Sequence, residues 1–109
     1  MRTVKSRDIM PIPTKRELIR EVRGGEPYEY YPLAQHIVVA PGVCGGRPTF
    51  KYTRLEVSMI LSSIAAGQSV QEVVRVYALS QLTPEAVVEA IHLADTALSE
   101  SAQGLRLAA

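Results

Sequence analysis

The sequence predicts a mainly α-helical protein, with three helices in a helix-turn-helix arrangement preceded by a short β-hairpin and an N-terminal arm that carries a short helix. Apolar residues between positions 56 and 99 recur with a period near 3.6, which is typical of amphipathic helices. Helix-start signals divide that stretch into three helices joined by short links. Just before it, two β-branched or aromatic runs flank a glycine-rich turn, which predicts the hairpin.

The composition is that of an ordinary globular chain. Its 109 residues are 47% hydrophobic and 21% charged, which predicts one domain with one modest core. No apolar run approaches the 18 or so residues that a membrane-spanning helix needs, so we expect no membrane partner. The N-terminus lacks the apolar segment of a secretory signal, and the single cysteine excludes an internal disulfide. These features favour a cytoplasmic location.

Residues 1–35 form the first of three predicted parts. Pro11 and Pro13 favour an extended arm. The segment "PTKRELIREVRGG" predicts a short helix, because Thr14 and Glu17 have the spacing of a capping box and a narrow apolar stripe follows. The next segment, "EPYEYYPLAQ", predicts an aromatic loop.

The second predicted part, residues 36–99, contains the hairpin and the three helices. "HIVVA" and "PTFKYT" predict two short strands, with Lys51 on one face of the second strand and its two aromatic residues on the other. The first helix covers 56–66. Ser69 and Glu72 form a capping box for the second helix. Thr83 caps the third, whose first position is a proline.

Residues 100–109 make the third part, a small and polar stretch that predicts a flexible tail.

Charge is distributed unevenly along the chain. Residues 1–54 carry ten basic and five acidic side chains, a net +5, whereas residues 55–109 carry two against six, a net −4. A basic half favours contact with nucleic acid, and the alternative is a dipolar surface with no dedicated partner. The DNA-binding candidates on the arm, the ribbon and the helix link are Lys5, Arg7, Arg47, Lys51, Arg54, Arg75 and Gln81.

No catalytic pattern is found, so we expect no enzyme activity, no cofactor, no metal and no small-molecule substrate. The glycines around Cys44 lead into a strand, whereas a phosphate-binding loop leads into a helix. The lone cysteine and two histidines lack the paired spacing of metal ligands. A nucleophilic Cys44 would need a positioned base, which no motif supplies.

The segments "CGGRPTFKYTRLEV" and "ILSSIAAGQSVQEVVRVYALSQLTPEAVVEAIHLA" resemble the bacterial domain-of-unknown-function family 433 over about residues 36–98. The resemblance rests on the Cys-Gly-Gly-Arg-Pro turn, the Thr-Arg-x-x-Val junction, the Ala-Gly-x-Ser link and the Leu-Thr-x-Glu helix start. Tyr52 stands where the family usually has glycine, which favours a regular strand here. The family is similar to homeodomain-like helix-turn-helix proteins.

This resemblance implies a function. Many members look like VapB-like antitoxins of type II toxin–antitoxin pairs, which bind a PIN-like ribonuclease and, as homodimers, operator DNA. A nuclease of that kind would offer a carboxylate cluster, so Arg106 with Leu105 and Leu107 is the candidate partner-binding group. Exposed strand edges in the hairpin are one route to a homodimer. The last helix begins with acids and no base, which favours the alternative of a protein-interaction or structural module that binds no nucleic acid.

Overall fold

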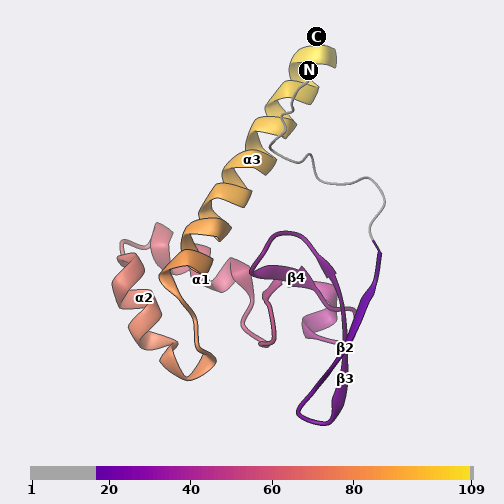
Figure 1. Cartoon of the computed structure of the whole chain (residues 1–109). Helices are drawn as coiled ribbons and strands as arrows, with labels where there is room; N and C mark the ends of the chain where they lie inside the picture. The colour runs from indigo at the N-terminus through magenta and orange to yellow at the C-terminus, as the bar shows by residue number, and fades with distance from the viewer. Residues whose placement is uncertain (1–16, 109) are drawn as a thin grey trace, which may run out of the picture.

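The protein is a mixed α/β structure, in which a four-stranded antiparallel sheet is followed by three α-helices (Figure 1). The computed structural model describes residues 17–108. The sheet has the order β2-β3-β4-β5, with β2 Ile19–Arg23, β3 Glu26–Pro32, β4 Ile37–Val39 and β5 Thr49–Phe50. The helices are α1 Val57–Ala65, α2 Val70–Val76 and α3 Pro84–Ala108, with short 3-10 turns at Cys44–Gly46 and Ala78–Ser80. The predicted helix-rich character therefore applies to the C-terminal part.

The short helix predicted for the N-terminal part is wrong. Residues 19–23 form β2, which pairs with β3 so that Arg23 lies opposite Glu26. Gly24 and Gly25 join the two strands with φ of 58° and 80°, and a type I′ two-residue hairpin turn requires positive values at both positions. A helix this short is marginal alone. Closure of the hairpin therefore outweighs the helical periodicity, and the predicted aromatic loop becomes β3.

The two strands predicted after residue 35 are present and pair with each other, with Ile37 opposite Phe50. β4 also pairs with β3, so it is an inner strand without a free edge, whereas β5 lies at the edge of the sheet. Tyr52 does not continue β5, because its φ is 68° and it lies in a turn. A tyrosine therefore adopts the left-handed backbone at the position where the resembling family usually has glycine.

The starts of the helices agree with the sequence. Ser69 and Glu72 form both hydrogen bonds of a capping box at the start of α2. The Thr83 hydroxyl accepts the backbone N–H of Ala86 at 3.2 Å at the start of α3. The end of α3 differs from the prediction, because residues 100–108 are helical and not a flexible tail. In Figure 1, α3 extends well beyond the sheet and the other two helices.

The main core lies between the sheet and the helices. Ile37 and Phe50 from the sheet pack with Ile60, Val73 and Val87, one residue from each of the three helices. A smaller cluster on the other face of the sheet contains Tyr30, Val38 and Ala40. Because successive residues of a strand point to opposite faces, Ile37 and Val38 of β4 serve different clusters.

Candidate functional site

The predicted DNA-binding residues have different environments. Lys5 and Arg7 lie outside the described residues. Arg47 and Lys51 are engaged by neighbouring side chains, as detailed below. The remaining three, Arg54, Arg75 and Gln81, are exposed.

Arg47 forms a two-pronged ion pair with Glu56. Its Nε lies 2.9 Å from Oε1 and its Nη2 lies 3.1 Å from Oε2. The hydrogen bond from Arg47 lowers the pKa of Glu56, and the same bond raises the pKa of Arg47. The pair joins the glycine-rich turn to the residue that precedes α1. A phosphate would have to displace both hydrogen bonds before it could engage Arg47 in the same way.

The carboxylate of Glu21 lies at the centre of a cluster of three tyrosines. Glu21 of β2 accepts hydrogen bonds from the hydroxyls of Tyr30 and Tyr52, both at 2.8 Å. These two bonds, chiefly that from Tyr30, lower the pKa of Glu21. Burial, and then the bond to Glu21, raise the pKa of Tyr30. The ring of Tyr28 lies between the other two, with centroids 5.1 Å from Tyr30 and 5.3 Å from Tyr52.

Two cations lie on these rings. The Arg23 guanidinium carbon is 3.8 Å from the centroid of the Tyr52 ring. The Lys51 ammonium is 5.0 Å from the Tyr52 centroid and 5.1 Å from that of Tyr30, distances at which a cation is attracted by the ring face. Interaction with Tyr30 is the main cause that raises the pKa of Lys51. Lys51 thus contributes to the aromatic cluster and is not a free basic side chain.

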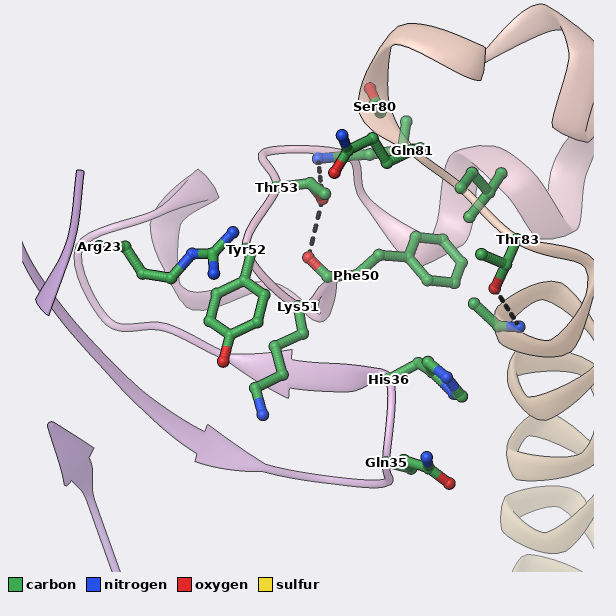
Figure 2. Close-up of a pocket in the computed structure, with 13 residues that line it drawn as sticks. Arg23, Gln35, His36, Phe50, Lys51, Tyr52, Thr53, Ser80, Gln81 and Thr83 are labelled. Carbon is green, nitrogen blue, oxygen red and sulfur yellow. Dashed lines mark hydrogen bonds between the residues drawn. The ribbon is translucent and has the colours of Figure 1, made fainter. Parts of the chain in front are cut away.

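A cavity of about 390 Å³ opens between this cluster and the link from α2 to α3 (Figure 2). Its apolar lining is formed by four buried residues, namely Phe50, Leu55, Leu82 and Ala86. Its polar lining is formed by Arg23, Gln35, His36, Lys51, Tyr52, Thr53, Ser80, Gln81 and Thr83. Figure 2 shows Gln81 and Thr53 on one side of the opening and Lys51 and Tyr52 on another.

The outer half of α3 carries an apolar stripe that the described part of the chain leaves uncovered. Val87 and Ile91 pack on the main core, and the same face continues at spacings of three, four and seven residues through Ala94, Leu98 and Leu105. All residues from 94 to 105 are exposed, with Leu98 at 71% and Leu105 at 73%. These twelve residues extend over roughly 18 Å of helix.

Two of the three predicted partner-binding residues can be only partly placed. Arg106 and Leu107 fall on the last turns of α3, and their side chains lie outside the described part of the structure. Leu105, the third, lies on the exposed stripe.

Cys44 has no neighbouring base bonded to it in the part of the chain that the structure describes. The Cys44 thiol donates to the backbone carbonyl of Arg54 at 3.2 Å, and no histidine or carboxylate bonds it. Among residues 17–105, no group of three potential ligands could hold a metal. None of the described helices combines the length and hydropathy needed to cross a membrane.

Comparison with known proteins places most of the described chain in one family. Residues 37–94 match the family described as "Protein of unknown function (DUF433)". The chain belongs to this family. Neither a curated protein nor a solved structure gave a significant match. The match agrees with the extent of the sequence resemblance, and it excludes β2 and β3, which supply Glu21, Arg23 and two of the tyrosines.

Sequence reasoning missed Arg23 and Glu21, and it ended the third helix before Leu105. The first two residues were assigned to a helix, so their proximity to Lys51 and Tyr52 could not be foreseen. The Gly24-Gly25 pair followed by the alternating Tyr28 and Tyr30 was the available signal for a hairpin. For α3, Leu98 and Leu105 continue the heptad spacing of Ile91, which was the available signal for a longer helix.

Proposed function

We propose that this protein is a non-enzymatic antitoxin of a type II toxin–antitoxin pair, which neutralises a PIN-like ribonuclease by binding it through the outer half of α3. The single observation that carries the proposal is the uncovered apolar stripe of Ala94, Leu98 and Leu105. Sequence resemblance within the family supplies the kind of partner. A protein that neutralises by binding needs a docking surface and no active site of its own.

The stripe suits insertion into a groove of another protein. An amphipathic helix binds in this way through residues three, four and seven positions apart. Asp95 and Glu100, the charged residues of the exposed stretch, are acidic, so this helix is unsuited to a nucleic acid. A groove in another protein would contact the stripe and both sides of the helix beside it. The same stripe on a second copy of this chain would contact the stripe alone.

Arg106 and Leu107 follow the stripe on the same helix. An arginine at this point would reach the metal-binding carboxylates of the nuclease and pair with them in two-pronged fashion. This assignment comes from the resemblance and the sequence position.

The proposal requires a neighbouring gene that encodes a PIN-like ribonuclease, and co-expression with that nuclease tests neutralisation. The 109-residue chain is expected to restore growth, and a chain lacking residues 102–109 to fail. Leu98→Glu is also expected to fail, because it places a charge in the groove. Gln103→Glu, a matched change on the other side of the same helix, is expected to succeed. Rescue by both defective variants would show that α3 is not the docking element.

Binding of operator DNA as a homodimer is the second part of the proposed function. Its support is that Arg54 and Gln81 are exposed, and that Gln81 lines the same cavity as Lys51. The homeodomain-like helix-turn-helix interpretation of the three helices also belongs to this proposal.

A protein-interaction module without nucleic-acid binding is the alternative. It is favoured by the exposed Glu85 in the first turn of α3 and by the engagement of Arg47 with Glu56. A gel-shift assay with the upstream DNA at two salt concentrations decides between them. Phosphate contacts must weaken as salt rises, so a complex that ignores salt, or no complex at all, supports the alternative.

A further inference from the structure

We infer that the cavity between the sheet and the α2–α3 link binds a small organic anion, a molecule with a carboxylate or phosphate group on an apolar body. This site lies apart from the outer half of α3 and does not depend on the proposed antitoxin function. It also departs from the expectation of no small-molecule ligand drawn from the sequence.

The size and lining of the cavity suit a small ligand. Its volume of about 390 Å³ falls in the range of about 300–1,000 Å³ typical of ligand pockets. Phe50, Leu55 and Leu82 are each at most 8% exposed and form an apolar surface that belongs to the main core. A rigid apolar surface surrounded by a few polar groups is the usual composition of such a site.

The charge of the lining selects an anion. Arg23 and Lys51 are its permanently charged side chains, and no carboxylate lines it. Two carboxylates lie nearby, outside the lining, and Glu21 offsets part of the positive charge of Arg23 and Lys51. Glu21 accepts the hydroxyls of Tyr30 and Tyr52, and Glu89 accepts the backbone N–H groups of the turn between β3 and β4.

Unused hydrogen-bond donors also line the cavity. The Arg23 guanidinium lies on the Tyr52 ring and has no hydrogen-bonded acceptor among the described residues. Within the same part of the chain, the side-chain amides of Gln35 and Gln81 also make no hydrogen bond. A guanidinium held flat by an aromatic ring keeps its edge available for two-pronged bonding to a carboxylate or phosphate.

Backbone strain is concentrated at the same place. Of the three described non-glycine residues with positive φ, Tyr52 at 68° and Gln81 at 59° both line the cavity. The left-handed region costs an ordinary residue roughly 1–2 kcal/mol, and such strain is often found where a ligand is held. Here the strain places Gln81 and Tyr52 on separate sides of the opening (Figure 2).

Amide chemical-shift titration of the 109-residue chain tests the inference. The probes are phenyl phosphate and benzoate, with benzyl alcohol as an uncharged counterpart. Both anions are expected to give saturable shifts at residues 51–53 and 80–83, and the stronger of the two identifies the preferred acid group. Benzyl alcohol is expected to bind more weakly at the same amides.

Matched variants identify the residue that recognises the charge. Arg23→Gln is expected to weaken anion binding about tenfold, as loss of a charged hydrogen bond predicts. Arg20 is an exposed cation on the same strand, and it pairs with Glu29 outside the cavity. Arg20→Gln should therefore leave anion binding unchanged. Gln81→Gly removes the side-chain amide at a position whose positive φ suits glycine, so the variant should stay folded. It is expected to bind the anions more weakly.

Three outcomes would overturn the inference. One is the absence of saturable shifts with either anion. Another is an equal effect of Arg20→Gln and Arg23→Gln, which would indicate non-specific attraction. The third is a set of shifts centred on Arg75 or on the turn around Cys44 in place of the cavity.

Discussion

The carboxylate of Glu89 accepts the backbone N–H of His36 at 2.6 Å, although the two residues are 53 positions apart in the chain. The same carboxylate accepts the N–H of Gln35 at 3.2 Å, and Nδ1 of His36 lies 3.2 Å from it. A side chain of α3 thereby caps the turn between β3 and β4. This contact fixes the sheet relative to α3 and holds the backbone of Gln35 and His36, two residues that line the cavity.

Replacing Glu89 by alanine is therefore expected to destabilise the fold. Two backbone N–H groups lose their acceptor, which costs roughly 1–3 kcal/mol of unfolding free energy. Glu89→Gln keeps one acceptor oxygen and should cost less. Urea denaturation measures both. Glu85→Ala is the control on the same helix, and an equal loss from it would show that the cap contributes nothing specific.

Acid should weaken the aromatic cluster through Glu21. The pKa of this carboxyl is lowered in the folded protein by hydrogen bonds from Tyr30 and Tyr52. Its contribution to stability is therefore complete above the unfolded value of 4.5 and is lost as the pH falls from there through the folded pKa. Unfolding measured at successive pH values should show this loss, and the Glu21→Gln variant should show less of it.

Glu56 and Glu72 have lowered pKa values as well, so the parent protein keeps an acid dependence from other groups. The difference between the parent and the variant isolates the Glu21 contribution. Parallel pH profiles would mean that the tyrosine hydrogen bonds do not favour the ionised carboxylate.

The sequence predicts those features that short-range chemistry decides. The capping box of Ser69 and Glu72 and the cap at Thr83 each depend on residues three positions apart, and both are confirmed. The strand at Ile37–Val39 is confirmed too. In contrast, the bonds of Glu89 to the turn and of Glu21 to Tyr52 join distant segments, and no local pattern specifies them.

The N-terminal hairpin is the instructive error. Ile19 and Val22 have helical spacing, yet in the structure they are 36% and 77% exposed, so the stripe that predicted a helix is not a buried face. What decides this segment is the Gly-Gly turn and the aromatic strand after it. The site residues Arg23 and Glu21 were missed together with the strand that carries them.

The turn itself provides the next prediction. Gly25 has φ of 80° and open space around it, so Gly25→Ala meets no steric neighbour but must adopt a left-handed backbone. We expect a loss of roughly 1–2 kcal/mol by chemical denaturation. Gly42→Ala, which also has open space but no positive φ, should be nearly neutral. Equal effects at the two positions would argue against this turn conformation.

The two halves of α3 should respond differently to truncation of their side chains. Val87 is fully buried in the main core, so Val87→Ala should cost roughly 2 kcal/mol. Leu98→Ala should change the unfolding free energy by less than about 0.5 kcal/mol, because Leu98 is mostly exposed. A large loss at Leu98 in the isolated protein would show that the stripe is already covered, by a second copy or otherwise.

Salt dependence of DNA binding distinguishes the basic residues of the proposed interface. Arg54 is exposed and its side chain makes no ion pair within the described residues, whereas Arg47 is held by Glu56. If each phosphate contact contributes about 0.9 to the slope of log affinity against log salt, Arg54→Gln should reduce that slope by about one. Arg47→Gln should leave the slope nearly unchanged, since its charge is already compensated.

Glu56→Gln is the matched variant for this experiment. It releases Arg47 from its partner without altering the number of basic residues, so the slope should increase by up to about one if a phosphate then takes the place of the carboxylate. Circular dichroism of each variant checks that α1 still forms. An equal decrease of the slope in the Arg47 and Arg54 variants would mean that DNA displaces Glu56, and that the ion pair serves only the unbound protein.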